Sequence, residues 1–418
     1  MGRRASKFSD APSHDERHVR TVMISLVGAC ALLAASNSVI FALLPALQDR
    51  YGFSNSGLGL VAAAGFGMSF VVQLLVAPLA DRGHARVLLV VGAVLSIAGN
   101  LLCAVSTGLG TIIAARALIG AAPGCFIPTA RALVSALGEK GRSERLGRMA
   151  SVEIVGFMAG PLIGGTLVGP LGVRTPFVIF CAFALLVVLI SLTAPVPTLE
   201  ARDDSGRIAI DLLRQRPMVV AVLMSAALGL PIGMYDALWA RYLSDLGARP
   251  WLVGISLACY SVPFLLFAGP AGRISERMGP LRTALRAMFL ITPLTISYSL
   301  FKNPWIPILV GITESLVQAA ALPASQTVVA NASPPGRAAS GQGLAGATNV
   351  LTMAVVAVVS GWLYGTFGVR TTFIAVASTA AFVAFLAYLV SLPLRGASDS
   401  ASDDAVGIPK ADPAVLES

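Results

Sequence analysis

The chain has 418 residues, of which 56% are hydrophobic and 12% are charged, and its formal net charge at pH 7 is +9. Soluble domains contain about 45–50% apolar and about 25% charged residues, so this composition excludes a water-soluble globular protein. The basic charge would also suit nucleic-acid binding, and the positions of the Lys and Arg residues have to decide what it means.

Long uncharged runs recur along the chain. A helix needs about 20 apolar residues to cross a bilayer, and the uncharged runs of this length are 21–47, 54–80, 175–199, 217–235, 250–272, 338–369 and 371–394. Further apolar stretches hold one charge each: 87–130 with Arg116, 149–170 with Glu153 and 303–336 with Glu314. The stretch 87–130 is long enough for two crossings, and the remaining span, 281–301, begins among Arg282 and Arg286. We predict an all-α membrane protein of about twelve transmembrane helices.

The basic residues are distributed unevenly between the two sides of the membrane. With the N-terminal tail in the cytoplasm and the spans alternating, those that fall outside are Arg50, Arg174, Arg241, Arg249, Lys302 and Arg370. The others, apart from the embedded Arg116, fall on the cytoplasmic side, which is the positive-inside pattern. Both termini are therefore predicted to be cytoplasmic, and nucleic-acid binding is an unnecessary explanation of the charge.

The two halves of the sequence repeat each other at a shift of about 195 residues. The segment 172–177 returns at 368–373, and the segment 79–82 returns at 274–277. Because the shift covers an even number of crossings, equivalent helices run in the same direction and form parallel repeats. The predicted organisation is a cytoplasmic tail (1–20), a six-helix bundle (21–199), a cytoplasmic linker (200–216), a second six-helix bundle (217–394) and a disordered cytoplasmic tail (395–418).

The loop after the second span carries a charged motif. Residues 77–86 resemble the signature G-x-L-A-D-R-x-G-R-R of the major facilitator superfamily, although Ala77 replaces the first glycine and Gly83 stands one place early. A second copy occupies residues 272–279. The resemblance covers roughly residues 20–394, and it implies a secondary transporter that works by alternating access.

The repeated acidic residues in these two loops are predicted to close the cytoplasmic side. Each alone would also suit a solvated anchor, but an acid is stabilised near a helix N-terminus and beside an arginine. In the family that the chain resembles, such an acid docks on the first turn of a helix in the opposite half. This implies Asp81 near Arg337, and Glu276 near Arg145 and Arg148. The predicted gate residues are Asp81, Arg82, Glu276 and Arg277.

The fifth span contains a pattern of small residues, Gly156, Gly160, Pro161, Gly164 and Gly165. Small residues at this spacing favour close helix packing. The pattern also resembles the motif G-x-x-x-G-P-x-x-G-G, which is associated with antiporters in the superfamily, and the equivalent part of the eleventh span lacks the full motif. We therefore expect Gly160 and Pro161 to form a close, bent contact between the halves, and we expect export and not import.

Charged residues within the spans are functional candidates, because a charge at a helix centre costs about 2.5–3.5 kcal/mol. Those predicted to couple proton and solute movement are Glu314, Arg116, Glu153 and Asp236. Arg116 resembles the arginine of the family's helix-4 motif, with a buried ion pair as the alternative. For Glu153 the alternative is a cytoplasmic contact. For Asp236, which we place near the outer end of its span, the alternative is an ordinary interfacial position.

Polar side chains in the spans are predicted to face the transport cavity: Asn37, Gln73, Gln318 and Asn349. Interhelical hydrogen bonds are the alternative explanation. The first span holds no acid, unlike several proton-coupled exporters of the family, so Glu314 or Glu153 would have to bind the proton. Gln318 lies one turn after Glu314 on the same helix face, and Arg116 lies in the opposite half.

The sequence therefore predicts a proton-coupled efflux antiporter for a drug-like or small amphipathic metabolite, with sodium as the alternative ion. An uptake symporter or uniporter on the same fold and a non-transporting membrane receptor are the rival hypotheses. The sequence contains no nucleotide-binding loop, no Gly-x-Ser-x-Gly elbow and no cluster of metal ligands. We therefore predict no enzyme, cofactor or metal site, and expect a monomer in the bacterial inner membrane.

Overall fold

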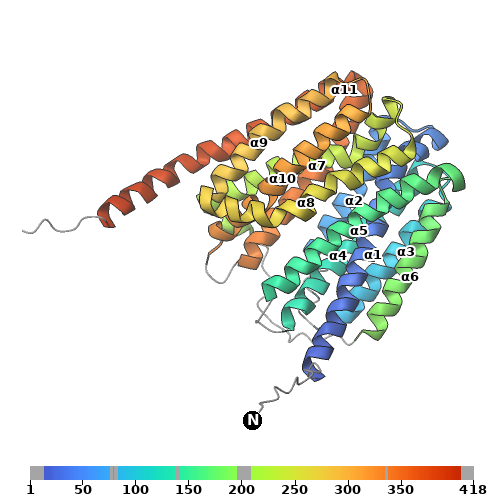
Figure 1. Cartoon of the computed structure of the whole chain (residues 1–418), viewed down its shortest axis with the longest axis horizontal. Helices are drawn as coiled ribbons and strands as arrows, with labels where there is room; N and C mark the ends of the chain where they lie inside the picture. The colour runs from blue at the N-terminus through green and yellow to red at the C-terminus, as the bar shows by residue number, and fades with distance from the viewer. Residues whose placement is uncertain are drawn as a thin grey trace, which may run out of the picture.

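The computed structural model of the chain describes residues 14–75, 79, 83–137, 142–194, 209–334 and 338–405. All regular structure in these residues is helical (Figure 1). The helices are α1 (His14–Tyr51), α2 (Asn55–Leu75), α3 (Ala85–Ala104), α4 (Leu109–Ala136), α5 (Arg142–Leu171), α6 (Thr175–Thr193), α7 (Arg216–Asp245), α8 (Pro250–Met278), α9 (Pro280–Ser297), α10 (Trp305–Ala332) and α11 (Ala338–Ala405), with the 3-10 turns η2 (Ala209–Arg214) and η3 (Tyr298–Leu300).

Most of these helices are suited to a bilayer. Within the described ranges, 10 helices are long and apolar enough to cross a membrane. Helices satisfy their own backbone hydrogen bonds, which hydrocarbon cannot do for them. Large apolar side chains also cover the outside of the bundle, such as Leu75 (66% exposed) and Leu309 (65%). Such a surface is a membrane contact and would be unfavourable in water.

The helix count depends on α9 and α11. α11 is interrupted at Gly368, whose φ of 79° and ψ of −177° are not helical, so it consists of two arms. α9 has 18 residues, including Arg282 and Arg286, and is not among the helices apolar enough to span. With both arms of α11 and with α9, the described residues form twelve helical segments. That all twelve cross the membrane remains a prediction.

The turns between helices repeat in the two halves. In the described part of the chain, positive φ angles occur only at glycines, which adopt them without steric cost. These glycines form three pairs at the spacing of the sequence repeat: Gly52 (66°) and Gly247 (85°), Gly83 (86°) and Gly279 (88°), and Gly172 (78°) and Gly368 (79°). Each pair occupies equivalent junctions, so the backbone repeats at the same shift as the sequence.

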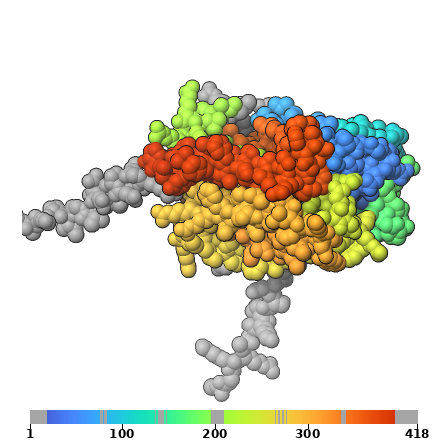
Figure 2. Space-filling model, turned by 90° about the horizontal axis from the view of Figure 1, so that it is seen from above, coloured from blue at the N-terminus to red at the C-terminus, as the bar shows by residue number. Residues whose placement is uncertain are grey.

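The helices form two groups. In Figure 1 the blue-to-green helices α1–α6 lie together beside the yellow-to-red helices α7–α11, and Figure 2 shows the same division from above. The groups contact each other mainly where α2 meets α11 and where α5 meets α8. One apolar cluster belongs to the first group and includes Leu33 and Phe126, whereas the largest contains residues of both, such as Val39 and Met234.

Candidate functional site

Arg116 is buried among the helices of the first bundle, with only 2% of its surface exposed. Its Nη1 donates to the side-chain Oδ1 of Asn37 on α1 at 2.8 Å and to the Asn37 carbonyl at 3.3 Å. The guanidinium carbon lies 4.7 Å from the ring centre of Phe41 and 5.9 Å from that of Phe66. A cation beside aromatic rings is stabilised by their electron-rich faces. Asn37 and these rings therefore hold the cation in an apolar bundle.

Gly65 of α2 leaves space for the Arg116 side chain. A Cβ atom added at Gly65 of α2 would lie 2.5 Å from Nε of Arg116, so any larger residue there would displace the guanidinium. Gly120, one turn after Arg116 on α4, packs directly against the Gly65 backbone. The two glycines bring α2 and α4 close together around the charge, as small residues do in membrane helix pairs.

Glu314 on α10 is fully buried, and tyrosine hydroxyls surround its carboxyl group. Tyr298 donates to Oε2 at 2.6 Å, and Tyr235 on α7 lies 2.8 Å from Oε1 and 3.0 Å from Oε2. Nε2 of Gln318 is 3.5 Å from Oε1. All these groups belong to the second bundle, so the carboxyl group has hydrogen-bond donors without any contribution from the first bundle.

An aromatic cluster fixes the tyrosines around Glu314. The ring centre of Tyr235 lies 5.8 Å from that of Trp239, 6.4 Å from that of Tyr260 and 6.0 Å from that of Tyr298. Trp239 in turn donates from Nε1 to Oγ of Ser256 on α8 at 3.0 Å. Edge-to-face rings at these separations have preferred geometries, so the cluster defines where the Tyr235 hydroxyl points.

Asp236 follows Tyr235 on α7. It interacts electrostatically with Arg116, although no direct ion pair within 4.0 Å joins the two side chains. The expectation that Asp236 lies near the end of its helix is wrong, because α7 continues to Asp245, more than two turns further. Among the acids predicted to couple transport, Asp236 is the one whose charge interacts with that of Arg116.

A model of the Major Facilitator Superfamily matches residues 26–240 and again residues 218–414 of the chain. The chain belongs to the major facilitator superfamily. Together with its apolar helices, this membership makes it a multi-pass transporter of the inner membrane and not an enzyme.

Curated relatives and solved structures agree with this assignment. The multidrug resistance protein MdtG of Citrobacter koseri is 25% identical over 340 residues, which cover 77% of this chain and 82% of the relative. MdtG of Enterobacter lignolyticus is 27% identical over 337 residues, covering 77% and 79%. Among solved structures, an inward-facing bacterial homologue of the lysosomal transporter Spinster has a TM-score of 0.77 at 16% identity, covering 90% of this chain and 98% of that one. The nucleoside transporter NupG has a TM-score of 0.73 at 15% identity, covering 90% and 99%.

In this superfamily member, the two bundles touch through glycines at repeat-related positions. A Cβ atom at Gly361 of α11 would lie 3.0 Å from Cα of Gly59 on α2, and one at Gly165 of α5 would lie 3.0 Å from Cα of Gly254 on α8. The repeat relates Gly59 to Gly254 and Gly165 to Gly361. These two crossings, which we call the glycine crossings, bring backbone directly against backbone where a side chain would separate the bundles.

The antiporter-like motif of α5 divides between two interfaces. Gly156, Gly160 and Gly164 face α1 of their own bundle, where Gly160 packs on Ser38 and Ala35. The expectation that Gly160 lies between the bundles is therefore wrong. Gly165 and the carbonyl of Pro161 contact α8, as expected for a contact between the bundles. A helix presents different faces to different neighbours. Gly160 and Gly165 are five positions apart, so they lie on different faces of α5.

A polar network joins the bundles at the end where α1 and α7 terminate, which is the outer end in the predicted topology. Nη1 of Arg241 on α7 lies 2.9 Å from Oδ1 of Asp49 on α1 and 3.2 Å from Oε1 of Gln48. Nη2 of Arg241 pairs with Asp245 at 2.7 Å, and Tyr364 of α11 donates to the same aspartate at 2.7 Å. We call this network the outer latch.

The remaining predicted residues have varied surroundings. Glu153 pairs with Arg131 of α4 at 2.7 Å, which is a partner on the cytoplasmic part of the bundle. Asn349 donates to the Ser225 carbonyl of α7 at 2.8 Å, and the exposed Gln73 donates to Ser69 one turn back. Within the predicted gate, Asp81 and Arg82 lie outside the described residues, the side chain of Glu276 is not described, and Arg277 is exposed at the end of α8.

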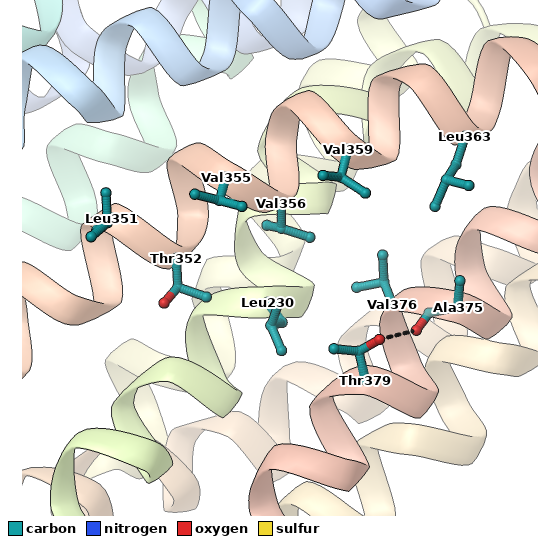
Figure 3. Close-up of a pocket in the computed structure, with 10 residues that line it drawn as sticks. All are labelled: Leu230, Leu351, Thr352, Val355, Val356, Val359, Leu363, Ala375, Val376 and Thr379. Carbon is teal, nitrogen blue, oxygen red and sulfur yellow. Dashed lines mark hydrogen bonds between the residues drawn. The ribbon is translucent and has the colours of Figure 1, made fainter. Parts of the chain in front are cut away.

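One pocket of the second bundle is lined mainly by apolar side chains. It has a volume of about 390 Å³ and lies between α7 and the two arms of α11, with Leu230, Leu351, Val355, Val359 and Thr379 among its lining residues (Figure 3). Several of these are exposed on the apolar surface. Its position and chemistry are those of a groove facing hydrocarbon chains, and none of the predicted site residues lines it.

We expect that Asp49→Asn weakens closure of the outer end, because it removes the acid that the first bundle offers to Arg241. An exposed ion pair contributes roughly 0.2–1 kcal/mol, so the open population should rise by about 1.4- to 5-fold. Spin labels at Thr107 and Asn303, exposed residues in outer loops of opposite bundles, would report the change as longer distances. Asp245→Asn is the matched control, since it leaves the pair between the bundles in place; an equal response to both variants would contradict this role of the latch.

Proposed function

We propose that this chain is a proton-coupled antiporter that exports a drug-like or small amphipathic solute from the cytoplasm. The observation that carries the proposal is the buried Glu314, held by tyrosine hydroxyls in one bundle. Asp236 of the same bundle, whose charge interacts with that of Arg116 in the other bundle, supports it. The MdtG relatives bear the name of multidrug resistance proteins, which supports export of drug-like solutes. The bundles would be residues 21–199 and 217–394, joined by a cytoplasmic linker.

Glu314 would exchange a proton with opposite sides of the membrane in turn. A carboxylate without a counter-charge is unfavourable in apolar surroundings, so the group is stable there when it is protonated or when a bound solute compensates its charge. With the outer side open, a proton from outside would neutralise Glu314 and release the solute. With the inner side open, the proton would leave to the cytoplasm and the carboxylate would attract the next solute.

Arg116 and Asp236 would make this exchange depend on the position of the bundles. Their electrostatic interaction joins α4 of the first bundle to α7 of the second. A rocking motion changes the separation of these charges, and in a medium of low polarity their attraction changes with it. A polar or cationic solute near Asp236 would compete with Arg116 for the same carboxylate.

The test is transport by the purified protein in liposomes. A panel of cationic, neutral and anionic amphipathic dyes should include at least one that accumulates against its gradient when a pH gradient is imposed, together with counter-movement of protons. A sodium gradient without a pH gradient serves as the control. Accumulation that follows only the sodium gradient, or solute movement in the same direction as the protons, would contradict the proposal in favour of a sodium-coupled carrier or an uptake symporter.

A further inference from the structure

We infer that Tyr235 is the positioning residue that connects the proton site to the charge pair between the bundles. The inference rests on the proposed function and deepens it. Tyr235 and Asp236 are neighbours on α7, and successive residues of a helix point about 100° apart. Tyr235 reaches Glu314 inside the second bundle, while Asp236 points in a different direction and interacts electrostatically with Arg116 of the first bundle. A movement that changes one contact has to move the other.

The Tyr235 hydroxyl lies in a chain of hydroxyl groups that ends at the carboxyl group. It is 2.8 Å from Oγ1 of Thr295 on α9, and either oxygen can be the donor. A hydroxyl carries one proton, so when Tyr235 donates to an ionised Glu314, Thr295 donates to Tyr235. When Glu314 is protonated, its own O–H can donate to Tyr235 and the direction of the chain reverses. The same heavy-atom positions thus accommodate both protonation states.

Tyr298 binds the same carboxyl group in a different way. Its hydroxyl lies 2.6 Å from Oε2, and it stands in η3 directly after α9. Among the described residues, Gln318 of α10 also lies near the carboxyl group, and Tyr260 of α8 interacts electrostatically with both Glu314 and Asp236. Of these groups, Tyr235 is the one whose helix also carries Asp236 and the latch residue Arg241.

The outer part of α7, beyond Pro231, is suited to bend relative to the rest of the helix. Pro231 lies one turn before Tyr235, and proline has no N–H for the helical hydrogen bond to the residue four places earlier. Sharp bends in helices occur at prolines. Gly233 lies next to this point and lets the α7 backbone pack against Met353 of α11. The segment 232–245 beyond the proline carries Tyr235, Asp236, Arg241 and Asp245, and therefore contacts the proton site, the charge pair and the outer latch.

Tyr235→Phe tests the inference because it removes the hydroxyl and keeps the ring in the aromatic cluster. In liposomes we expect solute exchange at equal pH to continue, while the number of protons moved per solute falls and accumulation on a pH gradient is lost. Tyr298→Phe should keep the stoichiometry. It should move the pH profile by about one to two units toward higher pH, since a lost hydrogen bond to a charged group disfavours the carboxylate. Tyr51→Phe, at a tyrosine that bonds Ser106 in the first bundle, is the control for the substitution itself.

The outcomes separate the inference from the proposed function. If the wild-type protein couples protons to solute and Tyr235→Phe couples them equally well, the inference is wrong and the proposed function stands. If Tyr298→Phe loses coupling to the same degree, any hydroxyl neighbour of the carboxyl group is sufficient. The inference that Tyr235 acts through its position on α7 is then wrong. If the wild-type protein moves no protons with its solute, both proposals fail. Thr295→Val removes the hydroxyl that hydrogen-bonds Tyr235 and so interrupts the same chain of hydroxyl groups. This variant provides the test if Tyr235→Phe does not fold.

Discussion

Replacing Glu314 by glutamine is expected to abolish solute accumulation on a pH gradient while downhill exchange of solute continues. Glutamine has nearly the shape of a protonated glutamate and can still bond Tyr235 and Tyr298, so the aromatic cluster around it should persist. It cannot release a proton, so the step that returns a carboxylate to the inner side is lost. Glu314→Asp should keep part of the activity, because the titratable group remains one methylene shorter.

The measurement is proton flux and solute flux recorded together in the same liposomes. Glu153→Gln is the matched control, since it makes the same chemical change at another acid of the membrane spans, one that pairs with the half-exposed Arg131. We expect this variant to keep its coupling. Uphill transport by Glu314→Gln with unchanged stoichiometry would show that Glu314 is not the coupling site, and Glu153 would become the next candidate.

Introducing a leucine at Gly165 is expected to stop transport by holding the outer end open. A Cβ atom at this position would lie 2.6 Å from the Pro250 carbonyl of the opposite bundle. Overpacking typically costs about 1–3 kcal/mol, which corresponds to a shift of about 5- to 150-fold in the balance of conformations. This exceeds the effect expected from the outer latch, because backbone atoms in direct contact cannot yield as an exposed ion pair can.

Gly169→Leu is the control for this substitution. Gly169 lies one turn further along the same helix, is exposed, and a Cβ atom there would meet nothing within 4 Å. The repeat-related Gly361→Leu should reproduce the loss at the other crossing. The spin labels at Thr107 and Asn303 would report the position of the outer end. A Gly165→Leu protein that folds and transports as fast as Gly169→Leu would show that the crossing does not control closure.

The fold and its repeat follow from the sequence because they depend on composition and spacing. Runs of apolar residues long enough for a bilayer predict the helices, and a constant shift predicts that the turns at Gly172 and Gly368 adopt the same backbone. The helix α9 was the most difficult transmembrane span to predict, since its two arginines lower the hydrophobicity of the segment.

The partners of the charged residues were harder to predict. A linear pattern shows that Arg116, Asp236 and Glu314 lie in apolar helices, but their contacts depend on how each helix is rotated in the bundle. The sequence therefore placed Arg116 and Glu314 in opposite halves but did not show that the charge of Arg116 interacts with that of Asp236. It likewise missed Tyr298, which follows α9 and reaches Glu314 only through folding. An isolated tyrosine near the end of a predicted span carries no signal that separates this role from ordinary packing.

The glycine crossings bear on how such a protein could arise. Gly361 meets the Asn55 carbonyl as Gly165 meets the Pro250 carbonyl, and Gly59 meets Ala357 as Gly254 meets Pro161, so each contact has a copy at the repeat shift. An interface in which one patch meets its own duplicate is the interface of a two-fold symmetric homodimer. A single ancestral six-helix unit could thus have closed on a second copy of itself before gene duplication and fusion joined the two. Neither Arg116 nor Glu314 has a charged counterpart at that shift, so the residues proposed to couple transport lie outside this symmetry.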